Sequence, residues 1–358
     1  LTNNTSSVIL SACVSSYSIS GNVFNDVDGL TDGNVDGTGT NVGAALYVSL
    51  VNSSNVVIAT VPVSATGTYT FPTVVPGSYT VVLHTTSGGS NIAALPAGWV
   101  NTGEDCCDNA GSDGTVNGIV PVTVAVANVT NANFGIEQPP TANKITLASQ
   151  ANPGGTNSVL IPANSFGGTD ASAGIITAIR ITAFPSNATS ITINGVTYTT
   201  LAAIQTAYPN GIPTNAAGEP TVPVNVDPID GSVTVAISYK TIDNAGVEST
   251  NTGAVNIPFT PISVSGNVLN DVNGLTNSNV DGTGTNAVGT LYVSLVNSSN
   301  VVVATVPVNA DGTYLFSSVT PGNYTVVLHT TLGGSNTAAL PAGWVNTGED
   351  CCYNTGSD

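Results

Sequence analysis

The chain has 358 residues, of which 3 are Lys or Arg and 21 are Asp or Glu, so its formal net charge is −18. Only 7% of the residues are charged, where about 25% is usual. Three cations cannot neutralise a phosphate backbone, which argues against a nucleic-acid partner, and an anionic membrane surface would repel the chain. No apolar run reaches the ~18 residues that a membrane helix requires. Hydrophobic residues still make up 41% of the chain, which is too many for a disordered protein.

A long internal repeat organises the sequence. Residues 19–113 match residues 264–358 at 74 of 95 positions after a shift of 245. We therefore predict a module over 19–140, a different module over 141–263, and a second, truncated copy of the first module over 264–358. Residues 1–18 are interpreted as the end of a preceding module or a linker. The chain contains no Met, and its second copy stops where the first continues, so we expect a window on a longer array.

Runs of alternating apolar and polar residues, separated by Gly, Asn and Pro turn signals, predict strands. In the first module they cover 19–24, 45–51, 56–61, 68–71, 78–85, 120–127 and 129–136. In the second module they cover 174–183, 190–193, 232–239 and 254–259, and residues 200–207 are predicted as one helical turn. The predicted fold class is all-β, with tandem Greek-key antiparallel β-sandwiches of the immunoglobulin-like or prealbumin-like kind.

Several motifs carry a resemblance to known modules. The segment Ser-Gly-Asn-Val-Phe-Asn-Asp-Val-Asp-Gly at 20–29, followed by an acidic Gly-rich loop, resembles the opening of B-type domains of serine-aspartate repeat adhesins and collagen adhesins. Those domains are prealbumin-like sandwiches. With Leu-Pro-Ala-Gly-Trp at 95–99 and Asn-Phe-Gly-Ile-Glu at 133–137, the first module is similar to repeats of giant secreted bacterial surface proteins. The second module, with its segments 164–170 and 243–246, resembles bacterial immunoglobulin-like or cadherin-like modules.

A cluster of oxygen ligands lies in the Gly-rich loop after the first strand. Ca²⁺ takes six to eight oxygens, and acidic residues with small spacers let one loop wrap around it. Clustered carboxylates also repel one another unless they are neutralised, and the adhesin domains that the module resembles bind calcium there. The alternative is a solvated acidic turn. The predicted ligands are Asp26, Asp28, Asp32, Asn34, Asp36 and, from a later acidic loop, Asp113, with repeat equivalents Asp271, Asn273, Asn277 and Asp281. The second copy replaces two carboxylates by amides, so we expect weaker binding there.

The cysteines follow the repeat only in part. Cys106 and Cys107 recur as Cys351 and Cys352, whereas the position equivalent to Cys13 holds Pro258. Each adjacent pair can form a vicinal disulfide, bond between parallel chains, or stay reduced, and both kinds of disulfide require an oxidising exterior.

Catalysis finds little support in the sequence, because it lacks a nucleophile elbow, a phosphate loop with its Lys, and a zinc signature. We interpret His84 and His329 as surface residues of a strand. Trp99 and Trp344 each stand alone between apolar residues, which favours a core position over sugar stacking. Lys144 and Asn256 could form an isopeptide bond, but Lys144 is more simply a solvent-facing charge.

These observations predict a structural and adhesive repeat segment of a long extracellular bacterial surface fibre, stiffened by calcium, and not an enzyme. We expect parallel lateral assembly into a homo-oligomer and a cell-surface or glycan target, with no nucleic-acid or membrane partner. The alternative function is an array of carbohydrate-binding modules attached to a secreted enzyme.

Overall fold

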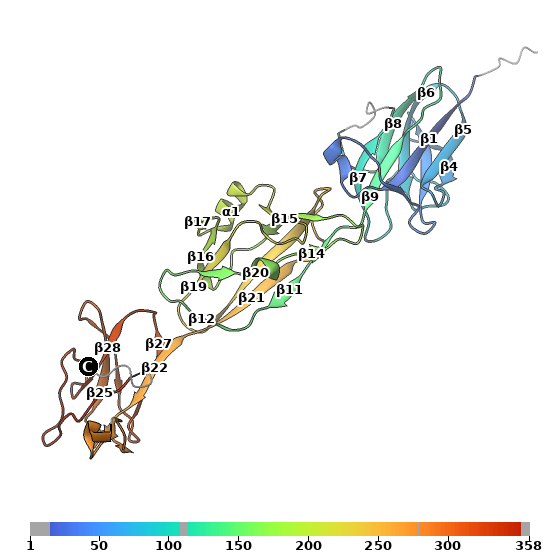
Figure 1. The fold of residues 1–358 in the computed structure, drawn as a ribbon. Coiled ribbons are helices and arrows are strands. Elements are labelled where there is room, and N and C mark those ends of the chain that lie inside the picture. Colours follow the sequence, from blue (N-terminus) through green and yellow to red (C-terminus); the bar gives the residue numbers. More distant parts are fainter. Residues whose placement is uncertain (1–14, 108–113, 278, 352–358) are drawn as a thin grey trace, which may run out of the picture.

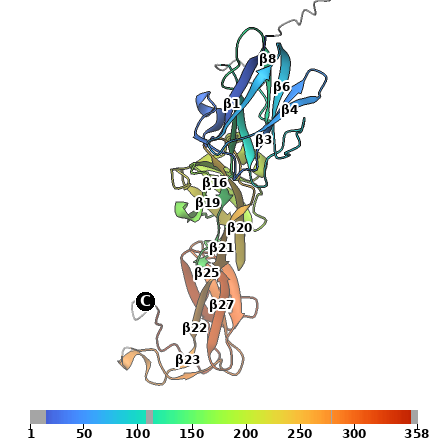
Figure 2. The same ribbon diagram turned by 90° about the vertical axis from the view of Figure 1, so that its right-hand side faces the viewer.

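The computed structural model describes residues 15–107, 114–277 and 279–351. They form three β-sandwich units that follow one another in an extended row (Figures 1 and 2), and we call them modules one, two and three. The buried hydrophobic cluster of module one lies within 19–136, that of module two within 142–259, and that of module three within 287–316. The predicted all-β class is confirmed.

Module one consists of two sheets around the first cluster. One sheet has the order β2-β1-β9-β7, with β5 also paired to β1, and the other has the order β4-β3-β6-β8. The strands are β1 (Tyr17–Asn25), β2 (Thr38–Gly39), β3 (Tyr47–Asn52), β4 (Val57–Pro62), β5 (Thr68–Val74), β6 (Gly77–His84), β7 (Val100–Asp105), β8 (Ile119–Val124) and β9 (Asn133–Glu137), with a 3₁₀ helix over Gly29–Asp32.

One pairing in module one is parallel, and it positions the site described below. β1 and β9 run in the same direction, with Val23 opposite Phe134 and Asn25 opposite Ile136. The amide of Asp26 then donates to the carbonyl of Ile136 over 3.0 Å. Because parallel strands end at the same edge of a sheet, Asp26 and Glu137 lie side by side at the edge that faces module two.

Strand β7 lies outside all the strands predicted from the sequence pattern. β7 pairs antiparallel with β9. The same six residues recur at 345–350 and form no strand there. The sequence of this segment is therefore insufficient for a strand, and the difference lies in whether a partner strand like β9 is present.

Module two contains a sheet of order β11-β21-β20-β15-β18, with β12 also on β21, a sheet of order β13-β19-β16-β17, and the two-stranded ribbon β10-β14. The predicted helical turn is confirmed as α1 (Leu201–Ala207), where Thr200 caps the first turn by accepting from the amide of Ala203. The strands are β10 (Thr141–Ala142), β11 (Lys144–Thr146), β12 (Gln150–Ala151), β13 (Val159–Ile161), β14 (Gly168–Thr169), β15 (Ile176–Ile181), β16 (Ala188–Ile193), β17 (Val196–Tyr198), β18 (Ile212–Pro213), β19 (Val224–Pro228), β20 (Val233–Asp243) and β21 (Gly253–Thr260), with a 3₁₀ helix over Ala163–Ser165.

Module three repeats the first six strands of module one, with the counterpart of β1 divided into β22 and β23. Its strands are β22 (Ile262–Asn267), β23 (Leu269–Asn270), β24 (Thr283–Gly284), β25 (Tyr292–Asn297), β26 (Val302–Pro307), β27 (Thr313–Val319) and β28 (Tyr324–His329), with a 3₁₀ helix over Gly274–Asn277. Its buried cluster contains 6 residues against 20 in module one, because the described part of module three has no counterparts of β7, β8 and β9.

The expectation that the histidines lie on the surface is wrong. His84 and His329 are both 0% exposed. His84 Nδ1 accepts from the amide of Thr86 over 3.1 Å, so Nε2 carries the proton and donates to Ser49 Oγ over 2.7 Å. His329 makes the same bonds with Thr331 and Ser294. Simple alternation missed this arrangement because a Ser on the neighbouring strand satisfies the buried ring.

The buried imidazoles predict acid sensitivity. Burial lowers the pKa of both His84 and His329 below the ordinary value of 6.5, so below that pH the unfolded chain binds protons that the folded chain does not. The contribution of these two histidines to the free energy of unfolding should then fall as the pH falls. We expect the double variant His84→Gln, His329→Gln to lose part of this fall between about pH 7 and about pH 5 in thermal unfolding. An unchanged slope would contradict the prediction.

Candidate metal centre

Four carboxylates meet at the junction of modules one and two, and we call Asp26, Glu137, Asp170 and Asp243 the junction cluster. Asp26 follows β1 and Glu137 ends β9, so module one supplies two of them. Asp170 follows β14 and Asp243 ends β20, so module two supplies the other two. The cluster therefore exists only where the two modules meet.

The cluster is compact and buried. One carboxylate oxygen from each of Glu137, Asp170 and Asp243 lies within 4.8 Å of the other two. Asp26 and Glu137 are 0% exposed and Asp243 is 1% exposed. No other three Asp, Glu, His or Cys side chains come this close among the residues that the structure describes.

Most of the buried oxygens in this region lack a hydrogen-bond donor. The described chain has ten buried side-chain oxygens without a partner, and six of them belong to the junction. These six are Asn25 Oδ1, Asp26 Oδ1, both carboxylate oxygens of Glu137, Asp170 Oδ2 and Asp243 Oδ2. Buried polar atoms are almost always paired, so this concentration makes the junction the strongest candidate for a cation site in the described part of the chain.

The remaining oxygens are fixed by the surrounding chain. Asp243 Oδ1 accepts from the amide of Val247 over 2.8 Å, and Asp170 Oδ1 accepts from the amide of Ser172 over 2.7 Å. Asp26 Oδ2 accepts from Thr102 Oγ1 over 3.3 Å. In each of these three carboxylates, one oxygen therefore accepts a hydrogen bond and the other has no hydrogen-bond partner.

Gly135 makes room for the cluster on β9. A Cβ atom at this position would lie 2.3 Å from Asp26 Oδ2 and 2.5 Å from Thr102 Oγ1. Any larger residue would displace the carboxylate of Asp26, so the Asn-Phe-Gly-Ile-Glu segment contributes both a ligand and the space beside it.

The hydrogen bonds across the junction converge on Ser172. The amide of Gln138 donates to Ser172 Oγ over 2.7 Å, and Asn25 Nδ2 donates to the carbonyl of Ser172 over 3.3 Å. On the same side, a Cβ atom at Gly29 would lie 3.4 Å from the Cβ of Ala245. These contacts bring the two edges together but leave the carboxylates between them uncompensated.

Burial and mutual repulsion raise the pKa of three cluster members. Burial, followed by the charges of Asp243 and Asp170, raises the pKa of Glu137 from 4.5 to about 9. Burial and the charge of Asp28 raise the pKa of Asp26 from 3.8 to about 7, and burial raises that of Asp243 from 3.8 to about 6. Two ionised carboxylates separated by 4.8 Å repel by about 3 kcal/mol at an effective dielectric constant of about 20.

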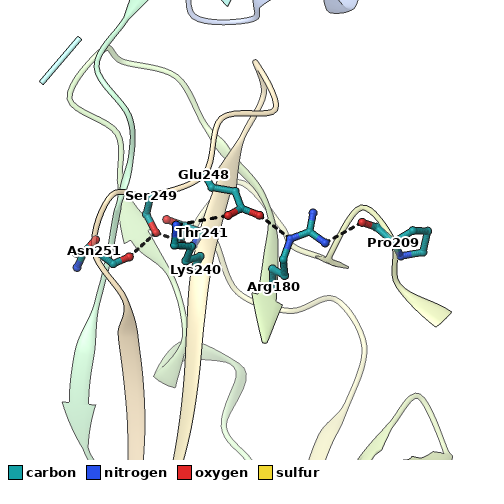
Figure 3. Close-up of polar contacts among 7 residues, drawn as sticks. All are labelled: Arg180, Pro209, Lys240, Thr241, Glu248, Ser249 and Asn251. Atoms are coloured by element: carbon teal, nitrogen blue, oxygen red, sulfur yellow. Dashed lines mark hydrogen bonds and ion pairs between the residues drawn. The ribbon is translucent and has the colours of Figure 1, made fainter. Parts of the chain in front are cut away.

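The basic residues of the chain do not relieve this repulsion. Arg180 Nε donates to Glu248 over 2.6 Å and Arg180 Nη1 to the carbonyl of Pro209 over 2.8 Å, while Lys240 Nζ lies 3.5 Å from the other Glu248 oxygen (Figure 3). Lys144 is exposed on β11. All three are therefore outside the core, and the ion pairs of the described chain both involve Glu248.

The donor set fits a hard divalent cation. It consists only of carboxylate, amide and hydroxyl oxygens, which suit Ca²⁺, Mg²⁺ and Mn²⁺ and not soft metals. Buried carboxylates that lack donors are stabilised when a cation neutralises them. Such an ion would bind residues of both modules at once, and Ca²⁺ accepts the mixed, irregular oxygen set found here more readily than Mg²⁺ does.

The predicted ligands of the acidic loop do not all lie in the same environment. Asp28 lies beside Asp26 and raises its pKa. Asp32 accepts from the amide and Nδ2 of Asn34 over 2.9 and 3.2 Å, which lowers the pKa of Asp32, and both residues are exposed. Asp36 is also exposed. Among the predicted ligands of module one, Asp26 alone belongs to the junction cluster, and calcium binding by the exposed loop stays a prediction.

Module three repeats the Asp26 position. Asp271 is 5% exposed, its Oδ1 accepts from the amides of Asn273 and Gly274, and its Oδ2 has no partner. Asn273 and Asp281 are exposed. Asp113 and Cys352, like the side chain of Asn277, lie outside the described part of the chain.

Sequence reasoning missed Glu137, Asp170 and Asp243 as ligands. All three lie inside the motifs that carry the family resemblance, at 133–137, 164–170 and 243–246, so the signal was present. They are separated by up to 106 residues in the sequence, and spacing within one loop could not reveal a site shared by two modules.

The cysteine pair has one bonding pattern in the structure. Cys106 and Cys107 form a vicinal disulfide, and Cys106 is 0% exposed within the core of module one. Cys351 is also disulfide-bonded. Of the alternatives, this arrangement corresponds to the vicinal bond.

The Trp and His residues, which could indicate sugar binding or catalysis, lie outside the junction cluster. Trp99 packs against the core of module one, and Trp344 is 38% exposed. The Ser49 and His84 pair is buried and its imidazole is held by two hydrogen bonds. No described helix has the length and hydrophobicity needed to cross a bilayer.

Comparisons with known proteins found no matching family and no curated relative. Solved structures align at low similarity. The major pilin BcpA of Bacillus cereus has 11% identity and a TM-score of 0.36, covering 92% of this chain and 93% of that chain. The T6 backbone pilin of Streptococcus pyogenes has 9% identity and a TM-score of 0.32, covering 87% and 76%. The major pilin SpaD of Corynebacterium diphtheriae has 10% identity and a TM-score of 0.27, covering 85% and 81%.

The raised pKa values predict how cation-free protein responds to pH. A carboxyl group whose folded pKa is raised contributes stability below its unfolded pKa and loses it as the pH rises through the folded value. With chelator present, the unfolding temperature should therefore fall between about pH 5 and about pH 9. Glu137→Gln should lose the larger part of this fall in scanning calorimetry. If wild type and variant show the same pH dependence, the repulsion assigned to Glu137 is wrong.

The vicinal disulfide predicts a monomer without interchain bonds at Cys106 and Cys107. Non-reducing electrophoresis should show monomer mobility, and alkylation of these two thiols should require prior reduction. A ladder of multimers that collapses on reduction would instead support bonds between chains.

Proposed function

We propose that this chain is a structural and adhesive repeat segment of a long extracellular bacterial surface fibre, in which Ca²⁺ held by the junction cluster stiffens the connection of modules one and two. The single observation that carries the proposal is the set of buried, unpartnered oxygens contributed by both modules to one place. A cation there converts repulsion between the modules into attraction.

The arrangement of the modules supports a shaft. Each sandwich has its own buried cluster, and the modules are joined end to end (Figure 1). An extended row of self-contained domains gives length without a large common core. The sequence between Asp36 and Glu104 contains no Asp, Glu, Lys or Arg, so strands β2 to β6 of module one carry no acidic or basic side chain apart from His84.

An extracellular location is consistent with the donor chemistry and the cysteines. Oxygen-only sites with several carboxylates are typical of Ca²⁺, which extracellular modules bind at ambient concentrations. A disulfide such as that of Cys106 and Cys107 persists in an oxidising environment. Lateral assembly of parallel chains and a cell-surface or glycan target belong to the same proposal.

Calcium should stabilise the folded protein. Binding to the folded state alone contributes about 2.7 kcal/mol when the free ion is at about one hundred times its Kd. We expect the unfolding temperature of chelated protein to rise on addition of Ca²⁺, and to rise far less for Glu137→Gln or Asp243→Asn. The measurement is scanning calorimetry combined with isothermal titration.

A matched control separates the junction cluster from the exposed loop. Asp32→Asn and Asp36→Asn alter the predicted loop ligands but no member of the junction cluster. These variants should keep the calcium-dependent rise. If they lose it while Glu137→Gln retains it, calcium binds the loop and the junction assignment is wrong.

A further inference from the structure

We infer that the two junctions of this chain differ in kind: the first is a joint locked by a divalent cation, and the second is rigid without one. The inference rests on the proposed function for its cation and goes beyond it by assigning the effect of that cation to one joint. An array built from these modules would then have one switchable joint in each repeat.

The first junction has little to hold it when the cation is absent. Its described direct contacts across the boundary include the two hydrogen-bonding groups of Ser172 with Asn25 and Gln138. Between them lie carboxylates of Glu137 and Asp243, buried without a neutralising partner. Buried carboxyl oxygens that lack hydrogen-bond donors cost free energy that contact with water would recover, so we expect this joint to open to water in the cation-free protein.

The second junction is a short backbone connection between two strands. β21 ends at Thr260 and β22 begins at Ile262, so Pro261 is the one residue between two paired strands (Figure 1). Each strand is held in its own sheet, β21 by β20 and β22 by β27. Pro also restricts its own φ and the conformation of the residue before it, which leaves few soft dihedrals at this boundary.

Residues 152–154 of module two, held by the side chain of Asn152, also restrict this boundary. Asn152 is 3% exposed, and its Nδ2 donates to the carbonyls of Ile229 and Gly231 over 2.8 Å each. Its Oδ1 accepts from the amide of Gly154 over 2.9 Å. A Cβ atom at Gly154 would lie 3.0 Å from Thr320 Cγ2 and 3.1 Å from Pro321 Cδ of module three. The loop therefore rests against module three, and no group of three acidic side chains occurs at this boundary among the described residues.

Two labelled pairs distinguish the joints in the full chain. Fluorophores are placed through unnatural amino acids at Ser54 and Gln205 to span the first junction, and at Gln205 and Ser299 to span the second. Ser54 and Ser299 are repeat equivalents on exposed turns, and Gln205 lies exposed on α1. The two pairs therefore share one labelled site and differ only in which copy of the repeated module carries the other. Distance distributions are measured by single-molecule energy transfer with chelator and with Ca²⁺, and calcium binding is measured separately by calorimetry.

We expect Ca²⁺ to remove the broad component of the Ser54 and Gln205 distribution and to leave the Gln205 and Ser299 distribution unchanged. Glu137→Gln should keep the first distribution broad in Ca²⁺, whereas Asp230→Asn, an exposed acid near the second junction, should behave as wild type. Equal narrowing at both junctions, or a second distribution that is already broad with chelator, overturns the inference and leaves the proposed function intact. Calcium binding without any narrowing at the first junction overturns both the inference and the proposed stiffening, but not the calcium site. Absence of calcium binding overturns both.

Discussion

The parallel pairing of β1 with β9 is the constraint on which the site depends. It brings the first and last described strands of module one to the same edge, so that Asp26 and Glu137 become neighbours although 111 residues separate them. Module two meets that edge with Asp170 and Asp243. Because Asp26, Glu137 and Asp243 are buried at this junction, the free energy of the junction depends on what neutralises them.

Local sequence pattern predicted much of the fold, and its failures have physical causes. The alternation of residues predicted most strands of module one, and residues 200–207 were predicted as the helical turn that the structure shows as α1. β7 was missed because its residues form a strand only beside β9, as the unpaired copy at 345–350 shows. His84 was placed on the surface because alternation does not reveal that Ser49 lies opposite to receive its proton.

The sequence predicted oxygen ligands for a hard cation, but not which residues form the junction cluster. The clustered acids of the Gly-rich loop predicted a site of oxygen ligands, and one of them, Asp26, belongs to the junction cluster. The loop residues Asp32 and Asn34 instead satisfy each other. Glu137, Asp170 and Asp243 come together only through the docking of two folded modules, which no spacing along the chain encodes.

Anomalous scattering from crystals grown with Ca²⁺ or a lanthanide substitute tests the central claim most directly, because it locates the ion without reference to stability. The account predicts an anomalous peak between modules one and two, bonded to oxygens of Glu137, Asp170 and Asp243. An ion found only on the exposed loop at Asp32 and Asp36, with the junction carboxylates still without one, would contradict it.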